Sequence, residues 1–317
     1  MIRKHYFRPP KSSAYIFPFM TMKHLPLNPR FLFLFVIGGL STCLFSACEK
    51  EMTDEVAIRK NRQANADITV TPQSDIELSE NNGKSKILVL DFTGQYCPYC
   101  PPIMKGLQKR ISETAEGHEN IFLVSMHPFY KFSPSFYSYD AEQYAGFFKI
   151  RGLPNVVTNY QKIGHFPDFN MLLNQRPQVI SGFVLERLDK NSVKATFKGK
   201  SLEGAEIAPE TRVMFWLIEK ELIGSQKDGF NYISNYTHHN VFRATLNGYK
   251  GEHYQLGKTF EKNLRVDPTN NGNSWRAINL ENCMILGILL DAESKKVLSV
   301  SSHDVPSIPT GIRRIRK

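Results

Sequence analysis

Two cysteines, Cys97 and Cys100, are the residues of this 317-residue chain best suited to do chemistry. Their spacing places them one turn apart on a helix. A thiol attacks as a thiolate, and the unpaired N–H groups of a helix N-terminus stabilise that negative charge. Cys97 is therefore predicted to be the nucleophile, and Cys100 the resolving thiol that attacks a mixed disulfide. Pro98 suits the first helical position, where no N–H is needed.

The segments around the two cysteines predict the elements that position them. Residues 86–92 form a short apolar run, typical of a strand buried on both faces. Ile103, Leu107 and Ile111 then recur at helical spacing, and residues 121–126 predict a second buried strand. A Cys-x-x-Cys motif between the strand and the helix of such a βαβ unit is typical of a thioredoxin-like redox site.

Two further features resemble the thioredoxin superfamily. Asp91 precedes Cys97 at the spacing of the buried carboxylate that takes a proton from the resolving cysteine in thioredoxins; otherwise it is an ordinary residue at a strand end. Residues 147–157 resemble the segment that carries the cis-proline, which makes Pro154 the predicted cis-proline. Leu153 and Tyr99 are then predicted to contact an extended substrate segment. The direction of the reaction is not readable from the motif.

No cofactor and no metal are expected. Zinc would need a second Cys pair or a Cys/His pair at suitable spacing, and the sequence has neither. The adjacent His238 and His239 would point to opposite sides of a strand, which favours structural or surface roles. Cys283 lies in an apolar run and is predicted to be an inert buried thiol. Residues 127–139, rich in Phe and Tyr, form either a patch that grips a partner or a loop that packs on the sheet.

The N-terminus predicts export. Residues 1–47 combine a basic segment with a short apolar run, and they end at a sequence that resembles the lipobox of bacterial lipoproteins. Cys48 is therefore the predicted lipidated residue. A box at Cys43 and an ordinary secretory signal are the alternatives. Residues 48–85 are polar and start with an acidic stretch, so they are predicted to be a flexible tether.

The charge distribution argues against nucleic-acid binding. A formal net charge of +10 would suggest such a partner. Six of the basic residues lie in the leader, where there is no acid, and four lie within residues 313–317. The body between them, residues 48–310, carries equal numbers of basic and acidic groups. No nucleic-acid partner is expected.

Residues 178–310 differ in pattern from the first half. Apolar and polar residues alternate in several short runs, which predicts an all-β module, and an immunoglobulin-like sandwich is the favoured type. The expected fold class is thus an α/β thioredoxin-like domain over residues 86–177 followed by this sandwich. Residues 311–317 form a basic tail.

The chain as a whole is similar to the Omp-twenty-eight-related outer-membrane lipoproteins of Bacteroidetes. The resemblance is carried by the leader and tether and by three motifs: Asp91-Phe-Thr-Gly-x-x-Cys-Pro-x-Cys100, Gly-Leu-Pro154 and His-His-Asn-Val-Phe-Arg243. It implies an outer-membrane lipoprotein with a thioredoxin-like fold, and it implies no established substrate. Periplasmic or cell-surface orientation and the oligomeric state stay open.

Two functions remain in competition. The first is a lipid-anchored thiol–disulfide oxidoreductase that acts on protein thiols or disulfides through Cys97 and Cys100. The alternative is a surface binding or adhesion lipoprotein that uses the thioredoxin fold as a scaffold.

Overall fold

The computed structural model describes residues 76, 78, 84–114, 118–162, 166–266 and 277–308. These residues lie in the unit Val70–Lys317. The leader, Cys48, most of the tether and the basic tail lie outside the described residues, so the predictions about them stay predictions.

Strands dominate the described residues, with 47% in strands and 17% in helices. The strands are β1 (Ile87–Phe92), β2 (Ile121–Met126), β3 (Asn155–Thr158), β4 (Gln161–Lys162), β5 (Val179–Asp189), β6 (Ser192–Ser201), β7 (Thr211–Asp228), β8 (Asn231–Thr245), β9 (Glu252–Tyr254), β10 (Thr259–Arg265), β11 (Cys283–Asp291) and β12 (Val297–Asp304). The helices are α2 (Cys100–Ser112), α3 (Tyr139–Phe147) and α4 (Phe169–Leu173), with short 3-10 turns at His118–Asn120, Tyr130–Phe132 and Leu280–Asn282.

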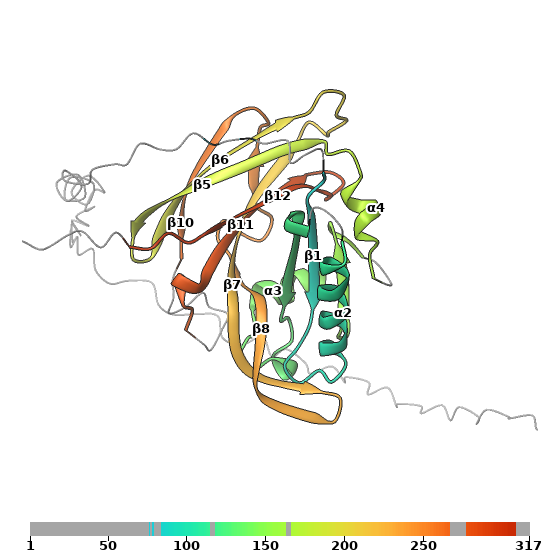
Figure 1. Cartoon of the computed structure of the whole chain (residues 1–317). Coiled ribbons are helices and arrows are strands. Elements are labelled where there is room, and N and C mark those ends of the chain that lie inside the picture. The colour runs from blue at the N-terminus through green and yellow to red at the C-terminus, as the bar shows by residue number, and fades with distance from the viewer. Residues whose placement is uncertain are drawn as a thin grey trace, which may run out of the picture. The chain divides into compact units, whose positions relative to one another are not determined.

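One nine-stranded sheet runs through most of the described chain (Figure 1). Its order is β12-β11-β7-β8-β2-β1-β3-β4, and β9 pairs with β7. β1 and β2 are parallel, with α2 in the crossover between them. β2 also lies parallel to β8, with Ser125 beside Val241, and this pairing joins the two halves of the sheet.

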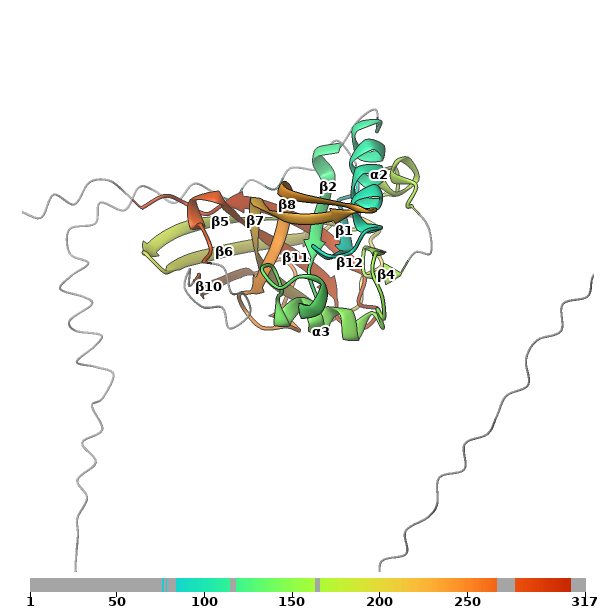
Figure 2. The ribbon, with the colours of Figure 1, turned by 90° about the horizontal axis from the view of Figure 1, so that it is seen from below.

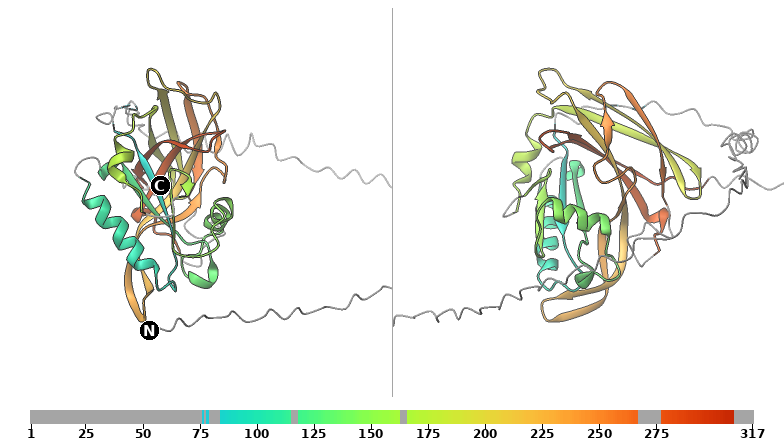
Figure 3. Two further views of the ribbon diagram at one scale, coloured as in Figure 1. Left: turned by 90° about the vertical axis from the view of Figure 1, so that its right-hand side faces the viewer. Right: turned by 180° about the vertical axis from the view of Figure 1, so that it is seen from behind.

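The two faces of β1 are covered by different helices. Leu88, Leu90 and Phe92 belong to the core cluster that includes α3, whereas Ile87 and Val89 belong to the cluster under α2 and α4. Figure 3 shows β1 between α2 and α3. Because side chains alternate along a strand, Asp91 faces the same side as Ile87 and Val89. The predicted carboxylate therefore points to the side of α2.

The predicted fold class is wrong. The strands assigned to a thioredoxin-like α/β domain, β1 to β4, share one sheet with β7, β8, β11 and β12, which were assigned to a separate immunoglobulin-like sandwich. A single core cluster spans this sheet, from Leu90 of β1 to Trp216 of β7 and Ile288 of β11. The βαβ unit is one part of a mostly β structure. The domain limits 86–177 and 178–310 stay a prediction.

A second sheet of three strands, in the order β10-β6-β5, packs on the large sheet at β7 and β11. Phe183 of β5 and Phe197 of β6 meet Phe215 of β7 and share a core with it. Figure 2 shows this small sheet away from α2. The two layers thus form a sandwich, but one layer is the large sheet that also contains β1 and β2.

Candidate functional site

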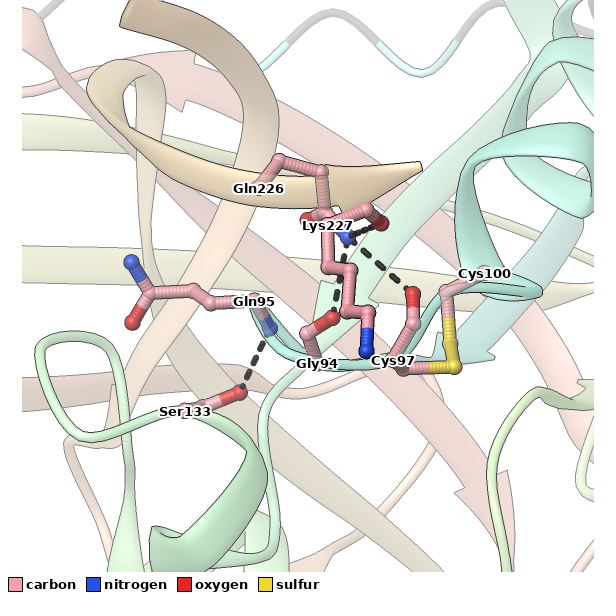
Figure 4. Close-up of a disulfide and its surroundings, with 7 residues drawn as sticks. All are labelled: Gly94, Gln95, Cys97, Cys100, Ser133, Gln226 and Lys227. Atoms are coloured by element: carbon pink, nitrogen blue, oxygen red, sulfur yellow. Dashed lines mark hydrogen bonds between the residues drawn. A yellow bond between two sulfur atoms is a disulfide. The ribbon is translucent and has the colours of Figure 1, made fainter. Parts of the chain in front are cut away.

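Cys97 and Cys100 form a disulfide in the loop between β1 and α2 (Figure 4). The loop turns at Gly94, whose carbonyl oxygen accepts a hydrogen bond from the Cys97 N–H at 3.0 Å. Both cysteines are buried, with 2% of Cys97 and 1% of Cys100 exposed. In this state very little of either cysteine is exposed.

The helix starts later than the sequence predicts. α2 begins at Cys100 with Tyr99 as its N-cap residue, so Pro98 precedes the helix and Pro101 occupies its first turn. Consecutive prolines are tolerated in a first turn, but they remove N–H groups that a helix N-terminus otherwise presents unpaired. Cys97 therefore lies in the preceding turn, where the stabilisation that unpaired helical N–H groups give a thiolate is weaker.

Asp91 is a buried acid beside this site. The side chain is fully buried, and neither carboxyl oxygen has a hydrogen-bond partner among the described residues. Desolvation raises the pKa of Asp91 to about 7. Near neutral pH the carboxyl can therefore hold or release a proton on the side of the sheet covered by α2.

A cavity of about 20 Å³ lies behind Cys100. This volume has room for about one water molecule. Hydroxyl, amide and imidazole groups supply most of the polar atoms around it. Its lining residues are Thr93, Cys100, Pro101, Met104, Ser125, Gln226, Tyr236, Thr237, His238 and His239.

The end of the hairpin formed by β7 and β8 packs against the disulfide loop. Gln226 of β7 is buried, and its side-chain amide donates to the carbonyl oxygens of Gly94 at 3.1 Å and Cys97 at 3.2 Å (Figure 4). It also donates to the carbonyl of Lys227 at 2.9 Å. One amide group thus connects both ends of the turn that contains Cys97.

The main chain of the same hairpin adds two bonds. The Lys227 N–H donates to the Gln95 carbonyl at 2.7 Å, and the Gly229 N–H donates to the Pro98 carbonyl at 2.9 Å. At the edge, the Lys105 ammonium of α2 pairs with the Asp228 carboxylate at 3.0 Å. The hairpin end is therefore bonded along the whole loop from Gly94 to Pro98.

Gln95 connects three segments. Its side-chain amide donates to the Ser225 carbonyl at 3.2 Å, and its side-chain oxygen accepts from the Ser135 N–H at 3.1 Å. Its own N–H donates to the Ser133 hydroxyl at 3.3 Å (Figure 4). The disulfide loop, the hairpin and the aromatic loop 127–139 are thereby tied together.

The aromatic loop combines the two alternatives that the sequence left open. Phe136 is buried and packs with Leu222 and Val241 at the base of the hairpin, and His238 lies 4.7 Å from its ring. By contrast, Tyr130 and Phe132 are exposed. Part of the loop is core and part is surface.

His127, at the start of the aromatic loop, is fully buried. Desolvation, together with the neighbouring His238 and Arg243, keeps the pKa of His127 well below its ordinary value. This imidazole is therefore neutral at physiological pH.

The other predicted site residues differ in packing and exposure. The Leu153–Pro154 peptide bond is cis. Leu153 packs on the disulfide loop, because its Cδ1 is 3.0 Å from where a Cβ on Gly94 would stand. Tyr99 is 72% exposed beside the disulfide. The structure thus gathers Cys97, Cys100, Leu153 and Tyr99 at one end of β1, and their roles stay predictions.

Cys283 is a buried free thiol at the start of β11. Its thiol donates to the Asn279 carbonyl at 3.2 Å. Burial, followed by the nearby Glu219, raises the pKa of the Cys283 thiol to about 12. A group with so little thiolate is chemically inert, as the apolar run suggested.

Sequence reasoning missed Gln226, Lys227 and Gly229, which cover the disulfide. One signal was present: the two loop residues between Asp228 and Asn231 are Gly229-Phe230, a glycine at the first loop position is typical of two-residue hairpin turns, and Gly229 adopts a positive φ of 59°. It predicts a hairpin at this position. It does not predict where the hairpin end packs.

Comparison with known proteins identifies the family. Residues 141–307 match the family model described as "Outer membrane protein Omp28". The chain belongs to the Omp28 family. The match covers more than half of the chain and begins after Cys100, so it does not include the disulfide. No curated protein matches the sequence.

Two solved structures resemble the Omp28-family chain. HBP35 of Porphyromonas gingivalis is 16% identical with a TM-score of 0.56, over 74% of this chain and 80% of that one, which indicates a shared fold. A domain of the outer membrane lipoprotein Omp28 from the same organism is 23% identical over 40% of this chain and 95% of that one. The TM-score of this second match is 0.30.

Family membership establishes the cellular location of the protein. The prediction of an outer membrane lipoprotein is confirmed at the level of the family. No helix among the described residues is long and apolar enough to cross a membrane. Attachment through a lipid on Cys48 stays a prediction, because that residue lies outside the described part of the chain.

Proposed function

We propose that this Omp28-family protein is a lipid-anchored binding protein that holds extended or unfolded polypeptide at the outer membrane. The observation that carries the proposal is a group of exposed aromatic side chains at the hairpin end, here called the tip patch: Tyr96, Tyr99, Phe230 and Tyr232. Tyr99 is 72% exposed, Tyr232 is 62% exposed and Phe230 is fully exposed.

The members of the tip patch are neighbours. Gly229, which precedes Phe230, bonds Pro98, which precedes Tyr99. Tyr232 pairs across the hairpin with Lys227, and Lys227 bonds Gln95, which precedes Tyr96. A cluster of exposed apolar side chains is typical of an interaction site. Aromatic side chains are also the residues that contribute most at binding interfaces.

The tip patch can be tested with a defined unfolded polypeptide. We expect the full mature chain to bind fluorescent, reduced and carboxymethylated α-lactalbumin, and the double variant Phe230→Ser, Tyr232→Ser to raise Kd at least about tenfold, since each aromatic anchor contributes about 1–2 kcal/mol. Fluorescence anisotropy measures this binding. The probe has no free thiol, so thiol exchange cannot contribute.

The matched control is Met171→Ser. Met171 is also an exposed apolar side chain, and it lies on α4, near the opposite end of β1 (Figure 1). It should leave Kd unchanged. Equal Kd values for wild type and the double variant, or no binding of the probe by wild type, would contradict the proposal.

The disulfide supports a second candidate function, thiol–disulfide exchange with a protein partner. The specific observation is Asp91, whose pKa of about 7 suits proton transfer near neutral pH on the α2 side of the sheet. A partner thiolate attacks the Cys97 sulfur, the bond between Cys97 and Cys100 breaks, and Cys100 leaves with the electron pair and takes up a proton. A second partner thiol then attacks the mixed disulfide, which oxidises the partner to a disulfide and reduces the pair to two thiols.

The exchange function predicts a trapped intermediate. The Cys100→Ser variant has no Cys97–Cys100 disulfide, so it traps the reverse exchange: the Cys97 thiolate attacks a partner disulfide, one partner sulfur leaves as a thiolate, and a mixed disulfide forms. No thiol at position 100 can resolve this mixed disulfide, so it should accumulate in the native envelope. It is detected as a band that disappears on reduction. Cys97→Ser is the matched control and should form far less. The same bands in both variants, or none in either, would exclude Cys97 as the exchanging residue.

A further inference from the structure

The hairpin end lies along the disulfide loop as a bound peptide would. Lys227 and Gly229 are two residues apart, and each donates its main-chain N–H to a carbonyl of the loop, at Gln95 and at Pro98. In an extended segment, N–H groups at this spacing point in the same direction. These are the bonds by which an added strand docks on a backbone edge.

Both cysteines of this loop are buried, and part of the hairpin lies against them. Gln226 bonds the Cys97 carbonyl at 3.2 Å and also lines the cavity behind Cys100. Gln226 thus contacts the Cys97 main chain and faces the same cavity as Cys100. We infer that the hairpin end must move away before another thiol reaches the disulfide.

The hairpin end is held by hydrogen bonds, whereas its base is also held by buried apolar packing. At the base, Leu222 and Val241 pack on Phe136 in a buried cluster. Further out, residues 230–235 are all exposed, and the pairing of β7 with β8 shifts register between Gly224 and Gln226. In the ion pair of Lys105 with Asp228 the two side chains are 61% and 25% exposed, so solvent screens the pair and weakens it. Such a segment can open locally while the sheet stays folded.

We propose that the backbone edge Gln95–Pro98 is a docking site for an extended polypeptide segment that carries a cysteine, and that the hairpin end occupies this site in the resting protein. The proposal rests on the exchange function and names its partner: a segment whose main-chain N–H groups replace those of Lys227 and Gly229. Once the hairpin end has moved away and this segment has docked, its thiol lies beside the Cys97 sulfur. Exchange then follows the two steps described for the second candidate function.

Two variants open the hairpin by different means. In one, residues 225–235 are replaced by Asn-Gly, which supplies a two-residue turn and removes the covering segment. In the other, Gly224→Ala places a Cβ 2.6 Å from the Phe136 ring, so the hairpin and the aromatic loop must move apart. Gly146→Ala in α3 is the matched control, since a Cβ there meets nothing within 4 Å. Circular dichroism establishes that each full chain is folded.

The measured quantity is the rate at which the disulfide is reduced. Three reductants are compared at equal thiol concentration: dithiothreitol, glutathione, and an unstructured ten-residue peptide with one central cysteine. We expect both hairpin variants to react at least about tenfold faster than wild type with dithiothreitol, with the control unchanged. With the shortened hairpin, we expect the peptide to react at least about tenfold faster than glutathione.

Two results would overturn the proposal. Unchanged rates with dithiothreitol in both folded variants would show that the hairpin does not control access. Faster rates with dithiothreitol, but no preference for the peptide over glutathione, would show that the freed edge does not dock a peptide. Neither result depends on a natural partner. Failure to trap a partner with Cys100→Ser would contradict the exchange function itself, and it is a different outcome from both of these results.

Discussion

Replacing Arg243 by methionine should lower the free energy of unfolding by about 3–5 kcal/mol. Arg243 of β8 and Glu219 of β7 form an ion pair at 3.3 Å, with only 1% and 2% of their side chains exposed. Removing the guanidinium leaves the Glu219 carboxylate buried without this cation, and the Asn279 N–H, 3.2 Å from its Oε1, is a neutral donor that does not replace the charge. Urea unfolding at pH 7, followed by tryptophan fluorescence, measures the change.

The structure explains why an arginine stands at this position. Leu217 pairs with Ala244 and Ile218 with Phe242, so Arg243 is the extra residue of a bulge between β7 and β8. Bulges redirect side chains locally. Here the bulge holds Arg243 next to Glu219, in the strands that continue into the hairpin over the disulfide.

Two further variants make the test specific. The double variant Glu219→Leu, Arg243→Met should recover at least half of the lost stability, because an apolar pair replaces a buried charge. Lys220→Met breaks an exposed pair with Asp304 and should change the unfolding free energy by less than about 1 kcal/mol. A single Arg243→Met variant as stable as Lys220→Met would contradict the assignment.

Asp91→Asn should stabilise the protein above neutral pH and flatten its pH dependence. Burial raises the pKa of Asp91 from 3.8 to about 7 in the folded state. The folded protein therefore binds this proton more tightly than the unfolded chain. Its stabilising contribution is complete below pH 4, is lost as the pH rises towards 7, and is absent above that. A difference of about 3 pKa units corresponds to about 4 kcal/mol.

Unfolding at pH 5, 7 and 9 tests this linkage. At pH 9 Asp91→Asn should be more stable than wild type by up to about 4 kcal/mol, and at pH 5 the difference should fall to less than half of that. Asp304→Asn, which changes an exposed carboxyl on β12, should keep the wild-type profile. Parallel profiles for Asp91→Asn and wild type would show that Asp91 is not the group that titrates.

Local sequence patterns were enough to predict several parts of the site. The apolar run at 87–92 is a strand buried on both faces, and the Cys-x-x-Cys motif stands between it and a helix. Alternation along the strand places Asp91 on the side of α2. Each of these features depends on residues close together in the chain, where spacing determines geometry. Membership of the Omp28 family and the outer-membrane location were likewise predictable from motifs.

The fold class could not be predicted in the same way. Periodicity distinguishes a strand from a helix, but it does not say which strand edges pair. The prediction of two separate folds failed at the parallel contact between β2 and β8, where the Ser125 hydroxyl bonds the His239 carbonyl across 114 positions of sequence. That contact merges the βαβ unit into the nine-stranded sheet.

The burial of the disulfide could not be predicted from the sequence for the same reason. The spacing of Cys97 and Cys100 predicts a pair that can react, and nothing near them in sequence predicts that they are covered. The covering residue, Gln226, is 129 positions away from Cys97. Its position follows from the length of the hairpin beyond the sheet and from the cluster of Phe136, Leu222 and Val241 that fixes the hairpin base. Short-range spacing therefore determined which groups can react, and long-range packing decided whether a partner can reach them.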